Sequence, residues 1–230
     1  MLSIILPAYN EAKRIEKAVE EIREYMLSSF SDFEIIIAED GSTDGTDRIA
    51  RGLAEKYSFV THLHSDERLG RGRALNNAIE TAKNEFVIYM DVDLSTDLKH
   101  IKDIYNALKS GYDIAIGSRL LKESNASRPF IRDFPSKVYN FLVRFLLKSK
   151  IHDHQCGFKG FRKSRVVKIL ETVSDNHWFW DTELLVLAQR RGLKIKEIPV
   201  RWSHGNESKV SVVGDSIYMF RNILRMMRER

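Results

Sequence analysis

Several features are scarce in this chain of 230 residues, and their scarcity limits what the protein can be. One cysteine, Cys156, excludes an internal disulfide and fits a reducing compartment. No run approaches the ~18 apolar residues of a membrane span. The start, MLSIILPAYNE, lacks the basic leader of a signal peptide and is expected to form a strand. Internal repeats, low-complexity tracts and linkers are also missing, so we expect a single domain over residues 1–230.

The composition favours a globular protein with an anionic partner. Hydrophobic residues make up 43% of the chain, which allows a substantial core. Lys and Arg number 37 against 32 Asp and Glu, giving a net charge of +5. This balance suits phosphates, anionic lipid surfaces or nucleic acid. Nucleic acid is disfavoured, because the sequence offers no platform of aromatic residues interleaved with basic ones.

Short apolar runs alternate with segments of helical spacing. Five runs are expected to be strands: 2–8, 33–39, 59–65 (the weakest), 85–91 and 112–118. Residues 11–27 and 100–111 each place apolar side chains on one helical stripe. Such alternation predicts an α/β fold with a mostly parallel sheet flanked by helices. Ligands of such sheets bind beyond the carboxyl ends of the strands.

Two carboxylates, Asp91 and Asp93, follow the very apolar run EFVIYM. In an extended segment residues i and i+2 point to the same side, so the two can converge. Paired carboxylates repel unless a cation lies between them, and oxygen ligands suit Mg²⁺ or Mn²⁺. A helix cap or a solvated turn is the alternative for so short a motif.

The segments PAYNE, EDGSTDGT and DVDLSTD at the strand ends resemble the family-2 glycosyltransferases of the GT-A (Rossmann-like) fold. The resemblance implies a nucleoside-diphosphate sugar as donor. It places Pro7, Tyr9 and Glu11 at the base and ribose, and Asp40 facing the base. It also places the metal near Asp91, Asp93 and Ser95, with Asp93 as the most direct ligand.

A narrower resemblance is to the dolichyl-phosphate glucosyltransferase and mannose synthase group, through RLGRGRALNNAI, IAIGSR, QCGFKGFRKS, WFWDTELL and EIPVRWSHGNESKV. It implies inverting transfer of glucose from UDP-glucose to a polyprenyl (dolichyl) phosphate. A GDP-mannose or UDP-GlcNAc donor, or a non-lipid hydroxyl acceptor, stays open, as does an idle sugar-nucleotide sensor. Residues 1–120 are expected to bind the donor and residues 121–230 the acceptor.

The acceptor decides which further groups the reaction needs. A hydroxyl must lose a proton to a base, whereas a lipid phosphate is already anionic and needs cations. By resemblance, Arg119 and Arg132 with Ser136 hold the acceptor phosphate, and Arg128 lies in the same loop. Lys209 resembles a diphosphate-contacting lysine, with His204 and Arg201 as alternatives. Asp181 occupies the position of the family's base, or it orders the sugar hydroxyls; Asp93, Asp181 and Arg119 are the predicted catalytic residues.

Two segments, 136–150 and 212–230, have an apolar stripe and a basic face. An amphipathic helix of this kind can lie in a membrane interface or can pack on the core. With the lipid acceptor in view, we expect a cytoplasmic protein bound peripherally to the cytoplasmic face of a membrane.

Overall fold

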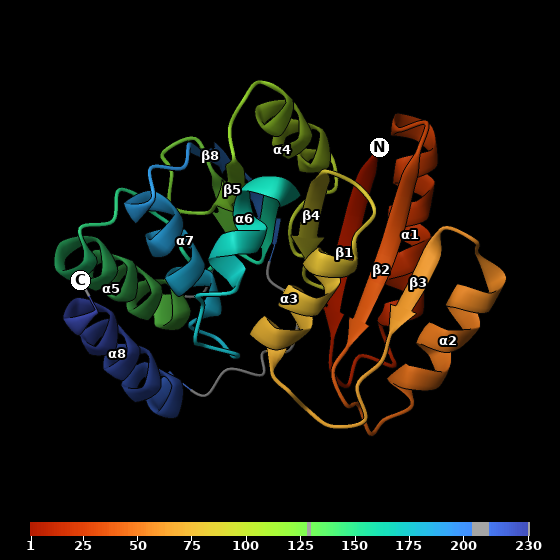
Figure 1. Cartoon of the computed structure of the whole chain (residues 1–230), viewed down its shortest axis with the longest axis horizontal. Coiled ribbons are helices and arrows are strands. Elements are labelled where there is room, and N and C mark those ends of the chain that lie inside the picture. The colour runs from red at the N-terminus through yellow and green to blue at the C-terminus, as the bar shows by residue number, and fades with distance from the viewer. Residues whose placement is uncertain (128–129, 204–211, 230) are drawn as a thin grey trace.

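The computed structural model describes residues 1–127, 130–203 and 212–229, and it contains one main sheet of seven strands in the order β3-β2-β1-β4-β7-β5-β8 (Figure 1). β7 runs antiparallel to its neighbours β4 and β5, and the other pairs are parallel. The strands are β1 (Leu2–Ala8), β2 (Phe33–Glu39), β3 (Val60–Leu63), β4 (Phe86–Met90), β5 (Ile114–Ser118), β7 (Phe158–Arg162) and β8 (Ile195–Pro199). The mostly parallel α/β fold expected from the sequence is confirmed.

Helices cover both faces of this sheet because the strands are apolar on both sides. One core cluster joins β1 and β2 to helices α1, α2 and α4. A second cluster joins the opposite face to α3, α6 and α7. These helices are α1 (Ile15–Ser29), α2 (Thr46–Lys56), α3 (Arg71–Thr81), α4 (His100–Lys109), α6 (Lys163–Leu170) and α7 (Trp180–Arg190).

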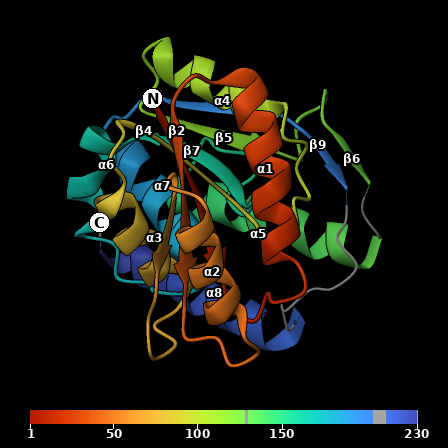
Figure 2. The same cartoon turned by 90° about the vertical axis from the view of Figure 1, so that its right-hand side faces the viewer.

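The two amphipathic segments form helices α5 (Phe130–Leu147) and α8 (Val212–Arg228), which lie side by side at one end of the molecule (Figure 1). Their inner faces pack with α7 through buried residues that include Val143, Leu147 and Ile223. A small parallel pair, β6 (Asn125–Ser127) and β9 (Arg201–Ser203), lies apart from the main sheet (Figure 2). Within the described ranges, no helix has the length and apolar character needed to span a membrane.

The sequence located these elements closely, with differences at the ends. The first helix begins at Ile15 rather than near residue 11, and a turn over residues 12–14 precedes it, in which the Glu11 carbonyl accepts from the Arg14 and Ile15 N–H groups. The strand expected at 85–91 ends at Met90. Asp91 and Asp93 therefore lie in a turn, and the strand alternation used to align them does not apply.

Candidate active site

The predicted donor residues gather at one edge of the sheet because their strands are parallel. In the β1–β2 register Ala8 lies opposite Glu39, so PAYNE and EDGS leave the sheet side by side. β4 ends at the same edge, with Asp91 directly after Met90. β7 runs the other way and begins at this edge, which brings Gly157 against the turn after β4: the Asp91 N–H donates to the Gly157 carbonyl over 3.1 Å.

The acidic turn after β4 holds its two carboxylates in different ways. Leu94 adopts a left-handed conformation, with φ of 49°, and its N–H donates to the Asp91 carbonyl over 3.1 Å. Asp93 Oδ1 accepts a hydrogen bond of 3.0 Å from the Ser95 N–H. The Ser95 hydroxyl is buried and has no hydrogen-bond partner among the described residues. An orphaned hydroxyl beside a carboxylate is the donor set that a hard divalent cation would complete.

Asp91 belongs to a charged network that continues beneath the turn. Arg71 bridges two acids, with Nη2 2.8 Å from Asp91 Oδ1 and Nη1 2.9 Å from Asp181 Oδ2. Lys159 Nζ lies 2.8 Å from Asp181 Oδ1 and 2.9 Å from the Tyr89 hydroxyl, which also donates to Asp181. Lys159 is fully buried and Asp181 nearly so, which explains why each charge has an opposite partner.

This network sets the protonation states of its acids. Burial raises the pKa of Asp181, but the ammonium of Lys159 and the guanidinium of Arg71 outweigh it and hold the pKa below its usual range. For Asp91, desolvation is the larger effect, so its pKa is raised although Arg71 opposes the shift. Asp181 is thus an ionised, fully engaged carboxylate, which suits an orienting group better than a base that must accept a proton.

The remaining donor-side residues lie around the loops that follow β1 and β2. Asp40 accepts hydrogen bonds from the Leu69 and Gly70 N–H groups at 2.7 and 2.9 Å. The Arg68 guanidinium lies over the Tyr9 ring, 4.0 Å from its centre. The RLGRGR segment therefore lies against the predicted base-binding loops. Glu11 forms an ion pair of 3.3 Å with Arg14, and Pro7 is the penultimate residue of β1.

Arg119, at the end of β5, is held by a buried acid that the sequence did not indicate. Its Nε and Nη2 bind Asp153 bidentately at 2.7 and 2.8 Å. Burial opposes its charge, but Asp153 raises the pKa of Arg119. Arg119 also lines a pocket of about 430 Å³ between the β5–β6 loop and α5. The polar lining of this pocket includes Lys137, Asn140, Arg144 and His152, with Phe141 at its apolar side.

The other predicted acceptor and diphosphate residues are only partly described. The Ser136 carbonyl accepts a hydrogen bond of 2.9 Å from Asn140 Nδ2 on the next turn of α5. Arg132 lies in α5, but its side chain is outside the described part of the structure. Lys209, His204 and Arg128 lie outside the described residues. Arg201 lies in β9, where its N–H donates to His100 Nε2 over 2.9 Å and its carbonyl accepts from the Asp97 N–H over 3.1 Å.

Comparison with known families decides the family. Residues 3–170 match the family described as glycosyl transferase family 2. The chain belongs to this family. The glycosyltransferase AglD of Haloferax volcanii is 46% identical over 228 residues, which are 97% of this chain and 36% of AglD. This chain therefore spans about a third of the length of AglD, and the activity of the whole of AglD is not assigned to it.

Further family members are covered more completely. The dolichyl-phosphate beta-glucosyltransferase ALG5D of Trichomonas vaginalis is 33% identical, with 98% of this chain and 72% of the relative aligned. The human dolichyl-phosphate beta-glucosyltransferase is 30% identical, with 97% and 74% aligned. A crystal structure of glucosyl-3-phosphoglycerate synthase from Mycobacterium tuberculosis with Mn²⁺, UDP and phosphoglyceric acid has a TM-score of 0.70 at 17% identity. It covers 97% of this chain and 76% of that one. The protein is thus a glycosyltransferase with the GT-A fold.

Sequence reasoning missed three members of this candidate site: Tyr89, Lys159 and Asp153. Tyr89 lies inside an apolar strand, where it is indistinguishable from a core aromatic residue. Lys159 lies between Phe158 and Gly160 in β7, and a lysine at such a strand position is typical of a residue that faces solvent. The one available signal was the QCGFKGF run itself, because a lysine flanked by such apolar residues in a central strand needs a buried acid.

Proposed function

We propose that this enzyme transfers a hexose, glucose from UDP-glucose, to a polyprenyl phosphate with inversion at the anomeric carbon. The observation that carries the proposal is the cationic pocket beside Arg119, which opens next to exposed phenylalanines of α5. A phosphate needs cations, and a polyprenyl chain needs an apolar path; both occur at this place. The names of the relatives aligned over their greater part support the same acceptor and donor class.

On the donor side, Pro7, Tyr9, Glu11 and Asp40 are proposed to contact the base and ribose. Asp91, Asp93 and Ser95 are proposed to hold Mg²⁺ or Mn²⁺, and the orphaned Ser95 hydroxyl supports this assignment. The ion, when bound, would stabilise the charge that develops on the leaving diphosphate. Mn²⁺ beside UDP in the similar synthase structure supports a divalent ion of this kind. Lys209 remains a proposed diphosphate contact.

Arg71 is proposed to set the position of Asp91 relative to the donor. Its two ion pairs fix the Asp91 carboxylate at 2.8 Å and tie it to the buried Asp181. Asp181 carries no transferable proton and has Arg71, Lys159 and Tyr89 around it. Its proposed role is to orient the sugar through this network. With a phosphate acceptor this orienting role is sufficient, because a phosphate does not have to lose a proton to a base.

On the acceptor side, the pocket offers a bidentate arginine and two further cations. Arg119, held by Asp153, is proposed to face the acceptor phosphate together with Lys137 and Arg144. Arginine and lysine bind phosphate through charge-assisted hydrogen bonds. Arg132 and Ser136 stay proposed contacts from the same helix.

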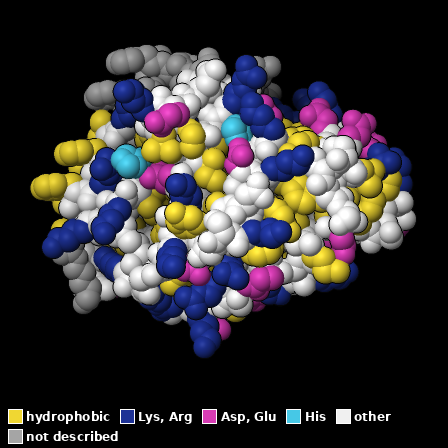
Figure 3. Space-filling model, turned by 90° about the horizontal axis from the view of Figure 1, so that it is seen from above, with side chains coloured by type: hydrophobic (Ala, Val, Ile, Leu, Met, Phe, Trp, Pro, Cys, Tyr) yellow, Lys and Arg dark blue, Asp and Glu magenta, His cyan; other side chains and the backbone are white. Residues whose placement is uncertain are grey.

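The outer faces of α5 and α8 are proposed to rest on the membrane that supplies the lipid. Phe141 and Phe145 stack at 6.1 Å between ring centres, yet they are 64% and 71% exposed. Ile217 and Phe220 of α8 are also exposed. Hydrophobic side chains project at the left edge of Figure 3, the side on which α5 and α8 lie in Figure 1, among Lys and Arg. Apolar anchors with neighbouring cations are typical of interfacial helices.

A transfer assay tests the proposal directly. The enzyme is given UDP- or GDP-sugars, Mg²⁺ or Mn²⁺, and either a short-chain polyprenyl phosphate or the matching polyprenol. We expect UDP-glucose to yield an anionic, organic-extractable product with the phosphate and none with the alcohol. Asp93→Ala should abolish transfer, and Arg144→Gln should raise the KM for the phosphate, whereas Arg51→Gln, an exposed change on α2, should not. Transfer to the alcohol, or an unchanged KM in Arg144→Gln, would contradict the acceptor assignment.

A further inference from the structure

A second group of ligand-type side chains lies at the same edge of the sheet but outside the proposed active site. Glu39 is the last residue of β2, and His62 belongs to β3, with His64 one residue beyond its end. Residues i and i+2 of a strand face the same side, so the two histidines point together. Ala38 pairs with Leu63 in the parallel register, which brings Glu39 alongside His64.

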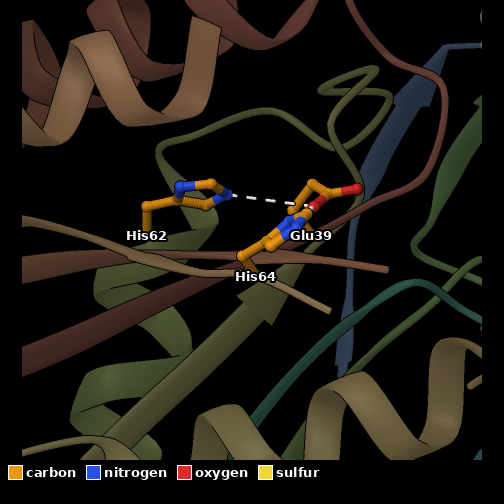
Figure 4. Close-up of side chains that lie close together, drawn as sticks. All are labelled: Glu39, His62 and His64. Atoms are coloured by element: carbon orange, nitrogen blue, oxygen red, sulfur yellow. Dashed lines mark hydrogen bonds and ion pairs between the residues drawn. The ribbon is translucent and has the colours of Figure 1, made fainter. Parts of the chain in front are cut away.

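The ligand atoms of these three residues converge. Figure 4 shows the His62 ring directed at the Glu39 carboxylate, with its Nε2 3.9 Å from Oε2. His64 Nδ1 bonds the same oxygen. One ligand atom from each residue lies within 4.8 Å of the other two. Among the described residues, this is the one group of three His, Cys, Asp or Glu side chains spaced in this way.

One nitrogen in this cluster lacks a partner. The His62 side chain is 8% exposed and that of Glu39 is 0% exposed. His62 Nε2 is buried without any hydrogen bond from the described residues. Leaving a buried polar atom unsatisfied is unfavourable, so this nitrogen is suited to a further ligand.

We propose that Glu39, His62 and His64 form a transition-metal site, suited to Zn²⁺, that is separate from the Mg²⁺ or Mn²⁺ site at Asp91 and Asp93. His62 Nε2, His64 Nδ1 and Glu39 Oε2 supply two nitrogens and one oxygen, a set that zinc accepts with a fourth position for water. The ligand atoms of a tetrahedral zinc site lie about 3.3 Å apart, given bonds of about 2.0–2.1 Å. The present 3.9 Å between His62 Nε2 and Glu39 Oε2 is about 0.6 Å longer than this, and a metal would also replace the hydrogen bond between His64 Nδ1 and Glu39.

The surroundings provide an entrance and an outer hydrogen bond. The His64 side chain is 37% exposed, so a metal and its water can reach the cluster from that side. Binding at Nδ1 leaves the His64 proton on Nε2, which lies 3.3 Å from Asp66 Oδ1. A carboxylate that accepts the second N–H of a metal-bound histidine fixes its tautomer and orientation.

The site would act on the loop that holds the donor. The Ser42 N–H donates to Glu39 Oε1, so the same carboxylate holds the start of the EDGS loop, next to Asp40. A metal bridging β2 and β3 would fix this loop relative to the β3–α3 segment that Asp40 contacts through Leu69 and Gly70. This structural role does not depend on which sugar or acceptor the enzyme uses.

Metal titration of the full chain, after treatment with a chelator, tests the site. Calorimetry with Zn²⁺ measures affinity and stoichiometry, and Co²⁺ reports tetrahedral ligation through its visible absorption. We expect one tight site in the wild type, weakened at least tenfold by His62→Gln and by His64→Gln. The control His152→Gln removes a histidine that pairs with Glu197 and is not part of the cluster, so it should leave the affinity unchanged, as should Asp93→Ala.

Three results would overturn the proposal: no zinc bound by the wild type, wild-type zinc affinity in both glutamine variants, or loss of the site only in Asp93→Ala. The last result would place the metal at the donor turn. Circular dichroism checks that each variant is folded. If His62→Gln does not fold, the partly exposed His64 decides the outcome through His64→Gln.

Discussion

Gly157 is the position where one added methyl group should remove most of the activity. A Cβ built there would lie 1.8 Å from Asp91 Oδ2, whereas ordinary van der Waals contact starts at 3.4 Å. The Asp91 carboxylate must therefore shift by roughly 1.6 Å, which disturbs its 2.8 Å ion pair with Arg71 and its position at the proposed donor site. A misplacement of about 1 Å in a reacting assembly can cost 10²-fold in rate.

We therefore expect Gly157→Ala to lower kcat/KM for the sugar donor by about 10²-fold, or about 2.7 kcal/mol of transition-state stabilisation. The assay is sugar transfer to a short-chain polyprenyl phosphate, with the donor concentration varied. Gly52→Ala is the matched control, because a Cβ at Gly52 in α2 meets nothing within 4 Å. That control should keep full activity and gain about 0.5–1 kcal/mol of stability.

Thermal unfolding separates loss of the site from loss of the fold. A folded Gly157→Ala variant with activity within twofold of the wild type would refute the assignment of Asp91 to the donor site. Equal losses of activity in both glycine variants would show that the effect is not specific to the turn after β4.

Three further changes test other parts of the structure. Lys159→Met should lower the free energy of unfolding by about 3 kcal/mol near neutral pH, because it leaves the buried Asp181 with one cation fewer. This loss of stability should shrink in acid as Asp181 becomes protonated, and chemical denaturation at two pH values checks it. His154 is buried, which lowers its pKa to about 3. Its contribution to the free energy of unfolding is therefore fully present above about pH 6.5 and is lost as the pH falls towards 3. His154→Gln should flatten that part of the stability–pH curve, and an unchanged slope would contradict this. The double variant Phe141→Ser, Phe145→Ser should bind anionic lipid vesicles on the order of 10²-fold more weakly at an unchanged melting temperature, because each ring contributes about 1.5 kcal/mol on leaving water. A vesicle flotation assay measures this binding, and Leu27→Ser, an exposed change on α1, is the control.

The sequence predicted the parallel part of the sheet and the edge where the site lies, because both follow from local patterns. The apolar runs at 2–8 and 33–39 match β1 and β2, and polar residues follow directly. The position of β7 between β4 and β5 was not predictable in this way. Strand order depends on contacts between distant segments, and a periodicity within one segment carries no record of them.

The same limit applies to the charged network. Lys159 and Asp181 are 22 residues apart, and Arg119 and Asp153 are 34 apart, so no local spacing links either pair. The amphipathic stripe of α5 was predicted correctly, including Phe141 and Phe145. The sequence could not tell that Val143 and Leu147 pack on the core together with Leu142 and Leu146 of the predicted stripe, which leaves Val138, Phe141 and Phe145 exposed.

Charge balance gives a physical reason for the proposed division between donor and acceptor halves. At the turn after β4, Arg71 pairs with Asp91 and Asp181, and Lys159 pairs with Asp181. Asp93 adds a third carboxylate beside these two cations, so a divalent cation would offset the excess of negative charge when an anionic diphosphate binds there.

The proposed acceptor pocket has a basic lining. Arg119 is paired with Asp153, and Lys137 and Arg144 line the same pocket, in which the described lining residues include no acid. Cations of this kind match a phosphate monoester, which carries up to two negative charges near neutral pH. A lipid phosphate would bring its negative charge to this basic lining and present its oxygen without needing a base.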